Sequence, residues 1–222
     1  MGSITAISVI NKAKVITQDL KDVFWPVSEP LDWLNAGQRD IAVNRPDVSS
    51  TLESHTCLQG PTQTIPADGL RFLDCTHNLA TGYVITPINR KDLDVVQRNW
   101  QRKDTDADEV YHYVFDERFP KQFKLYPAPA LGVLVEIGFS KSPTPVTLSA
   151  FDGTDVSPIS IDDTYEMALV YFVLAMLFQK KTNVTAHRDK VTQYYSMYYQ
   201  TLGVKFNADS LMSANNPVNK ED

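Results

Sequence analysis

The spacing of apolar residues changes twice along the chain. Before about residue 50 and after about residue 159, apolar side chains recur at the helical interval of three to four residues. Between these segments, short runs rich in valine, isoleucine, tyrosine and phenylalanine follow the period of two that is typical of strands. Helices at the two ends bury their apolar stripes at lowest cost against each other. The sequence therefore predicts an α+β fold, in which N- and C-terminal helices form a bundle around a β-rich insertion.

Four regions follow from this division. They are the N-terminal helices (1–49), the β-rich insertion (50–158), the C-terminal helices (159–203) and an extended tail (204–222). Gly203 marks the predicted end of the last helix, because glycine commonly follows a helix C-terminus. Ordering each tail residue costs ~1–2 kcal/mol, whereas burying each of its few apolar side chains returns only ~1.5–3 kcal/mol. We therefore expect the tail to be mobile in the free chain and to become ordered on a partner.

Two helices are predicted before residue 50. The first is expected over residues 4–23, and Ser28 is expected to cap the second. The segment DWLNAGQRDIAVNRPDV (32–48) is amphipathic and is ended by Pro46. Gly37 permits close approach of a neighbouring helix, at a propensity cost of ~1 kcal/mol. The polar side of this helix is expected to face outward, where another copy could contact it. That side comprises Gln38, Arg39, Asp40 and Arg45.

The middle and C-terminal segments carry the remaining elements. Antiparallel strands are expected in the runs TQTIPADGLRFLDC, GYVITPI, EVYHYVFD, QFKLYP and GVLVEIGFS, with a short helix or turn at 89–100. The later segment TYEMALVYFVLAMLFQKK is apolar nearly all round, which predicts the central buried helix. Asp162 and Asp163 are expected to cap it.

The last helix carries aromatic residues on two sides. Tyr194, Tyr195, Tyr198 and Tyr199 lie in neighbouring pairs, and adjacent helical residues point about a quarter of a turn apart. One small core cannot bury both sides. The tyrosines on one side of the helix are expected to pack into the core. Those on the other side could equally well contact another subunit or partner.

Composition excludes several classes of protein. The net charge of −6 and the pI near 5.2 argue against binding nucleic acid by its phosphates, which needs clustered Lys and Arg. Cys57 and Cys75 lack metal-ligand spacing and are interpreted as buried thiols of a reducing compartment. The longest apolar run, residues 167–178, is shorter than the ~20 residues of a membrane span. A soluble, cytoplasmic chain without a membrane anchor is expected.

No motif indicates a cofactor, a metal or catalysis. Asp104, Asp106 and Asp108 resemble the start of a calcium loop, but Glu109 stands where the turn needs glycine and Phe115 where a glutamate ligand is needed. The four histidines are scattered. Paired acids could in principle serve a small hydrolase, although adjacent carboxylates in such segments are usually turn formers. These acids are Asp116, Glu117, Asp152 and Asp155.

The order of the distinctive segments resembles one family of proteins. LDWLNAGQRDIAVNRPDV, QTIPADGLRFLD, VYHYVFDERFPKQFKLYPAP and VEIGFSKSPTPV are followed by a helical hairpin with an acidic cap. This arrangement, over roughly residues 31–198, resembles the head-to-tail adaptor (connector) proteins of tailed bacteriophages. None of these segments is a chemical signature, so the resemblance rests on their combination.

The resemblance implies a structural virion protein made in the host cytoplasm. It implies a ring of about twelve copies beneath the portal protein, a tail (nozzle) protein below, and a channel that DNA crosses without specific binding. Carboxylates lining that channel would repel the phosphates. Another neck or tail ring component is the alternative, and a hydrolase is the more distant one. The expected subunit contacts are Arg39, Arg45, Tyr195 and Tyr199, and the expected portal contacts are Val204, Phe206, Leu211 and Met212.

Overall fold

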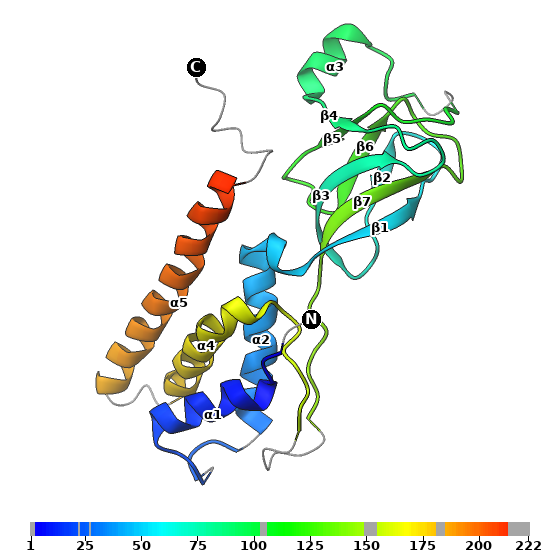
Figure 1. Cartoon of the computed structure of the whole chain (residues 1–222). Helices are drawn as coiled ribbons and strands as arrows, with labels where there is room; N and C mark the ends of the chain where they lie inside the picture. Colours follow the sequence, from blue (N-terminus) through cyan, green and yellow to red (C-terminus); the bar gives the residue numbers. More distant parts are fainter. Residues whose placement is uncertain are drawn as a thin grey trace. The chain divides into compact units, whose positions relative to one another are not determined.

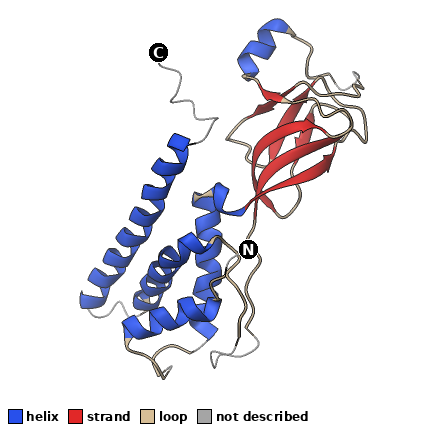
Figure 2. Cartoon of the chain, viewed as in Figure 1, coloured by secondary structure: helices blue, strands red, loops and turns tan. Residues whose placement is uncertain are grey.

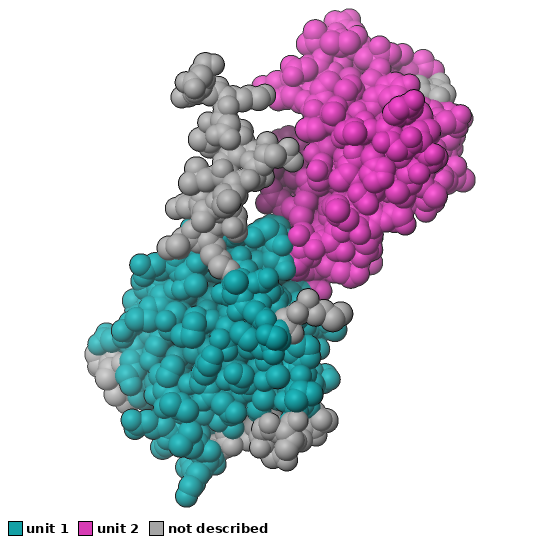
Figure 3. Space-filling model, in the orientation of Figure 1, with its two compact units in different colours: residues 1–48, 143–222 teal, residues 49–142 magenta. Residues whose placement is uncertain are grey.

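The chain divides into a helical unit and a β-rich unit. The computed structural model describes residues 3–21, 23–26, 28–102, 106–148, 155–180 and 185–212. One unit comprises residues 1–48 and 143–222, and the other comprises residues 49–142 (Figure 3). The described helices belong to the first unit except for one short helix, which accompanies the strands of the second (Figure 2). The α+β fold expected from the sequence is confirmed, and helices from both ends of the chain share one unit.

The helical unit is built around one central helix. Its elements are α1 (Ala6–Thr17), α2 (Ser28–Asn44), the 3-10 turns η1 (Pro46–Ser49) and η2 (Asp163–Tyr165), α4 (Glu166–Gln179) and α5 (Thr185–Met212). Helices α1, α2 and α5 all pack on α4 (Figure 1). Most residues of α4 are buried, as its nearly continuous apolar sequence predicted. Because α4 is covered on several sides, it positions the other three helices.

Close packing of α2 on α4 depends on one glycine. A Cβ atom at Gly37 would lie 2.8 Å from Cδ1 of Phe172 and 3.2 Å from Cδ2 of Leu169, both on α4. Real Cβ contacts are rarely so short, so the two helices can approach this closely only without a side chain at position 37. The prediction that Gly37 permits the approach of a neighbouring helix is confirmed.

The two acidic residues before α4 have different roles. Asp162 accepts a hydrogen bond from the backbone N–H of Thr164 at 2.8 Å and caps η2. The N-cap residue of α4 is Tyr165, which makes no side-chain capping hydrogen bond, so the expectation that Asp162 and Asp163 cap α4 is wrong. Asp163 instead accepts hydrogen bonds from the backbone N–H groups of Ser3 (2.7 Å) and Ile4 (3.2 Å). These hydrogen bonds hold the segment before α1 against the start of α4.

Helix α5 is longer than predicted. It continues through Gly203 to Met212, so the expected end of the helix at Gly203 is wrong. Gly203 lacks the positive φ of a capping glycine, and glycine inside a helix costs only ~1 kcal/mol relative to alanine. No proline follows before Pro217 to stop the helix. The remainder of the expected tail, residues 213–222, lies outside the described residues.

Two sheets share the core of the β-rich unit. One has the antiparallel order β1 (Ser50–Thr56), β7 (Leu134–Lys141) and β3 (Gly69–Asn78), and the other has the order β2 (Thr62–Thr64), β6 (Gln122–Tyr126), β5 (His112–Phe115) and β4 (Thr86–Pro87). Phe72, Phe123 and Phe139 are buried in one cluster, where the rings of Phe72 and Phe123 stack at 4.3 Å. This core is separate from the core of the helices.

Two features of these sheets differ from the prediction. Strand β1 lies outside the predicted runs because it is an edge strand whose residues all keep some exposure, which removes the apolar alternation. Strand β4 pairs with β5 in parallel, so the expectation of antiparallel strands throughout is wrong. Helix α3 (Arg90–Val96), which was predicted within 89–100, lies between these strands in the sequence. The long crossover that contains α3 makes the parallel pairing possible.

Candidate functional site

Two amides of α2 bind the chain that returns from the β-rich unit to α4. Asn35 pairs with the backbone of Val146, accepting from its N–H at 2.8 Å and donating to its carbonyl at 2.9 Å. Gln38 is 1% exposed, and its Oε1 accepts from the backbone N–H of Ser160 at 2.6 Å. The returning chain thus gains the hydrogen bonds that a strand partner would supply. Gln38 was expected to face outward, and this expectation is wrong.

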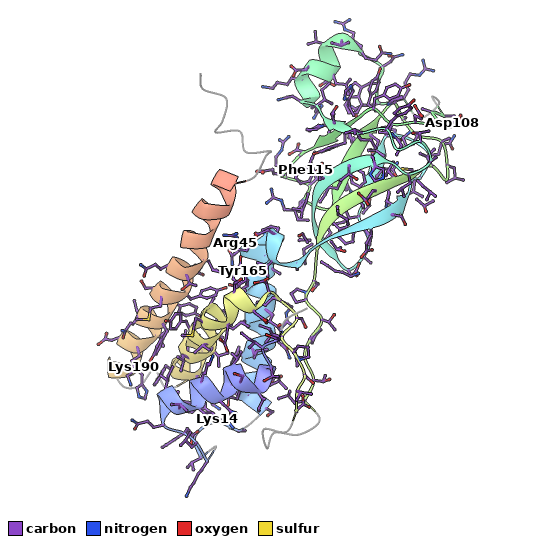
Figure 4. All side chains as sticks on the ribbon, viewed as in Figure 1. Lys14, Arg45, Asp108, Phe115, Tyr165 and Lys190 are labelled. Carbon is purple, nitrogen blue, oxygen red and sulfur yellow. The ribbon has the colours of Figure 1, made fainter. Side chains whose placement is uncertain are left out.

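The C-terminal part of α2 is hydrogen-bonded to α5. Arg45 is 3% exposed, and its guanidinium donates to Asp47 at 2.8 and 2.9 Å and to the carbonyl of Leu202 at 3.3 Å (Figure 4). The hydroxyl of Tyr198 donates to the half-buried Asp40 at 2.5 Å. The outward position expected for Arg45 is therefore wrong, because Asp47 neutralises its charge and the carbonyl of Leu202, distant in the sequence, accepts its remaining hydrogen bond. Arg39 remains exposed, as expected.

The tyrosines of α5 divide between core and surface. Tyr198 is fully buried in the core of the helices, and Tyr194 packs at its edge. Tyr195 is half-buried and donates to the sulfur of Met176 at 3.1 Å. Tyr199 is 57% exposed. Of the two explanations that the sequence left open, core packing accounts for one side of the helix, and Tyr199 stays available for a contact outside the unit.

The exposed side of α5 around Tyr199 carries no charge. We call this surface the α5 face and define it by the exposed residues Gln193, Ser196, Tyr199 and Gln200. No Asp, Glu, Lys, Arg or His occurs from residue 191 to residue 204. A helix side that faces water normally carries charged residues, so this composition is unusual for a surface that stays solvated.

A second uncovered surface lies between α1 and α4. We call it the α1–α4 groove; its volume is about 580 Å³ and its apolar lining comprises Ile7, Val15, Ile16, Met167 and Val170. Val15 and Met167 are 64% and 41% exposed. Lys12 also lines the groove, and its ammonium group pairs with the carboxylate of Glu166 at 2.5 Å.

The chain after α1 is held by a buried carboxylate. Helix α1 ends at Thr17 rather than at the predicted residue 23, and Asp19 is only 4% exposed. Asp19 accepts from the backbone N–H groups of Val23 (2.8 Å), Phe24 (3.0 Å) and Trp25 (3.1 Å). Burial alone would raise the pKa of Asp19, but these hydrogen bonds to the charged form outweigh it and the pKa is lowered. The carboxylate orders a loop whose Val23 and Phe24 are exposed.

Residues 4–220 match the SU10 adaptor protein family. The chain belongs to this family. The match covers both units, and it confirms the resemblance to phage head-to-tail adaptors seen in the sequence over residues 31–198. The adaptor is accordingly a component of a phage particle. No curated protein matches the chain.

The β-rich unit of the adaptor presents an exposed apolar surface of its own. We call it the turn surface; it comprises the exposed residues Leu79, Tyr83, Val84, Leu131 and Leu134. The backbone N–H of Leu79 donates to the carbonyl of Leu134 at 3.0 Å, and Asn78 is bonded to Tyr83, so the turn after β3 lies beside the start of β7. Apolar residues gathered on neighbouring turns are typical of a contact surface.

Two of the acids considered for a hydrolase are engaged in surface ion pairs. The guanidinium of Arg118 donates to Asp116 at 2.6 Å and lowers the pKa of Asp116 to about 2. Glu117 is 81% exposed and pairs with Arg71 at 2.8 Å. A carboxyl group with so low a pKa is a poor general acid or base near neutral pH.

The remaining acids have other surroundings or lie outside the described residues. Asp155 belongs to the helical unit and accepts from the backbone N–H of Ser157 at 2.8 Å. Asp152 and Asp104 lie outside the described residues. Asp106 accepts from Gln59 at 2.8 Å. In the part of the chain that the structure describes, no three His, Cys, Asp or Glu residues are grouped as metal ligands, and no helix is long and apolar enough to span a bilayer.

The residues expected to bind the portal lie on the C-terminal part of α5. Val204, Phe206, Leu211 and Met212 fall within the helix, beyond Leu202, which is the last residue of the core. Their backbone is helical, and their side chains lie outside what the structure describes. The helical continuation past Gly203 could have been read from the spacing of Val204, Ala208, Leu211 and Met212, which is i, i+4, i+7 and i+8.

Asp19 provides a pH-dependent test of the loop after α1. Replacing Asp19 by asparagine is expected to lower the free energy of unfolding by about 1–3 kcal/mol at neutral pH, because three backbone donors lose a charged acceptor. Since the folded-state pKa is lowered, this stabilisation is complete above the ordinary value of 3.8 and is lost as the pH falls through the folded value. Urea unfolding of both proteins should therefore converge in acid; a pH-independent difference would contradict this role.

Proposed function

We propose that the adaptor forms a ring beneath the portal, joins the capsid to the tail and leaves a central channel for DNA. The observation that carries this proposal is the family match, which extends over both units. The apolar α1–α4 groove, the apolar turn surface and the uncharged α5 face support it, because a protein that acts alone rarely leaves several such surfaces uncovered.

The proposed portal contact is the C-terminal part of α5. Helix α5 has 28 residues and α4 has 14, so at ~1.5 Å per residue α5 is longer by about 20 Å. Leu202 is the last core residue, and it is tied to Arg45 through its carbonyl. The segment after it has helical backbone and regularly spaced apolar residues, as expected of a helix that docks in a groove. Val204, Phe206, Leu211 and Met212 are the proposed contacts.

The β-rich unit has its own core and presents the turn surface, which we assign to the tail (nozzle) protein. The helical unit, with two uncovered surfaces, supplies the wall of the ring. The net charge of −6 suits a channel that DNA crosses without being held, because carboxylates repel phosphate.

Mixing the purified adaptor with the isolated portal ring tests this function. The full-length chain should co-sediment with the portal in equal numbers of copies, and the complex should then capture the tail protein. Failure of the adaptor to bind a correctly assembled portal ring would contradict the proposal. Binding to isolated tails alone would assign the protein to another ring of the neck or tail.

A further inference from the structure

We propose that, in the ring, the α5 face of one copy packs into the α1–α4 groove of the next copy. This inference rests on the proposed ring and goes beyond it by naming the two surfaces that meet. Tyr199 is the central side chain of one surface, and Val15, Ile16 and Met167 form the apolar floor and rim of the other.

The composition of the α5 face favours burial against protein. Residues 191–204 contain no charged side chain, although Gln193, Ser196, Tyr199 and Gln200 are exposed in the single chain. The centres of protein interfaces are depleted of charged residues and enriched in tyrosine. Tyr199 stacks loosely on Tyr195 at 6.4 Å and contacts Tyr198 edge-on at 5.1 Å. These neighbours limit its motion, so little conformational entropy is lost when it is buried.

The chemistry of the groove matches this face. Its apolar residues can cover the ring of Tyr199, while the phenol hydroxyl needs a polar partner when it is buried. The groove offers such a partner in Lys12, whose charge is already neutralised by Glu166. Uncharged amides such as Gln193 can approach this pair without introducing a like charge, so an uncharged α5 face suits the groove better than a charged one would.

The placement of the two surfaces suits a closed ring. A cyclic assembly of more than two copies needs two different surfaces on each copy. One surface binds the preceding copy and the other binds the following copy. Helices α1 and α5 both pack on α4, and neither packs extensively on the other, so they occupy different parts of its surface (Figure 1). The α5 face and the α1–α4 groove therefore belong to different parts of the helical unit, where a head-to-tail contact between copies can repeat.

Cross-linking of paired cysteines tests the contact. The variant Tyr199→Cys/Val15→Cys, treated with a short bis-maleimide, should give a ladder of covalent multimers both on the portal ring and in the concentrated free chain. The native thiols do not interfere, because Cys57 and Cys75 are fully buried and burial raises the pKa of the Cys57 thiol to about 12. Each single variant should remain uncross-linked.

A matched control pairs Tyr199→Cys with Val95→Cys. Val95 is 82% exposed on α3, so it reacts as readily as Val15 but lies outside the groove. A ladder from this control equal to that of the test variant would overturn the inference. Equimolar binding to the portal without any ladder from the test variant overturns the inference and leaves the proposed function standing. Absence of both the portal complex and the ladder overturns both.

Discussion

Replacing Gly37 by valine is expected to lower the free energy of unfolding of the helical unit by about 1–3 kcal/mol or more. The new Cβ would lie 2.8 Å from Cδ1 of Phe172 and 3.2 Å from Cδ2 of Leu169. The ring of Phe172 cannot simply rotate away, because it packs edge-on against Tyr198 at 5.4 Å. Alanine at position 37 should be milder, since its better helix propensity offsets ~1 kcal/mol of the clash.

The control for this prediction is Gly203→Ala. A Cβ at Gly203 meets no atom within 4 Å among the residues whose side chains the structure describes, and this glycine also lies inside a helix. Alanine there should raise stability by up to ~1 kcal/mol, because only the propensity changes. In a chain of this size each 1 kcal/mol shifts the melting temperature by roughly 2–4 °C, so thermal unfolding resolves both effects. A Gly37→Val protein as stable as the natural one would contradict the close packing of α2 on α4.

Removing residues 204–222 is expected to abolish binding to the portal ring while leaving both units folded. Tyr198 and Leu202 are the last core residues that the structure describes, so the truncated chain keeps all of the described core, together with the hydrogen bond from Arg45 to the carbonyl of Leu202. Apolar side chains buried at a partner contribute ~1.5–3 kcal/mol each. Loss of Val204, Phe206, Leu211 and Met212 should weaken binding at least about 100-fold, which corresponds to ~2.7 kcal/mol.

A shorter truncation separates the two parts of the C-terminal segment. Removing only residues 213–222 keeps the whole of α5, and this variant should still bind the portal. Sedimentation with the portal ring measures binding, and thermal unfolding verifies that each truncated chain is folded. If the chain without residues 204–222 still joined the portal normally, the portal contact would have to lie elsewhere in the protein.

Sequence patterns predicted the elements whose causes are local. The even apolar character of residues 167–178 identified the central helix, and Gly37 indicated a close helix approach. These features depend on a few neighbouring residues, so a single sequence is enough to find them.

The burial of polar residues of α2 could not be predicted from neighbouring residues in the sequence. Gln38 and Arg45 were expected at the surface because both are polar and lie on the side of the helix away from its apolar residues. Each is buried by a partner far along the chain, Ser160 for Gln38 and Leu202 for Arg45. Only the fold brings these partners together. Of the expected subunit contacts, Arg39 and Tyr199 are left exposed by the structure.

Native mass spectrometry of the adaptor, with and without the isolated portal ring, tests whether the adaptor forms a ring on the portal. We expect a complex whose mass equals the portal ring plus one adaptor for every portal chain. An adaptor that stays a monomer beside an intact portal ring at saturating concentration would show that it forms no such ring.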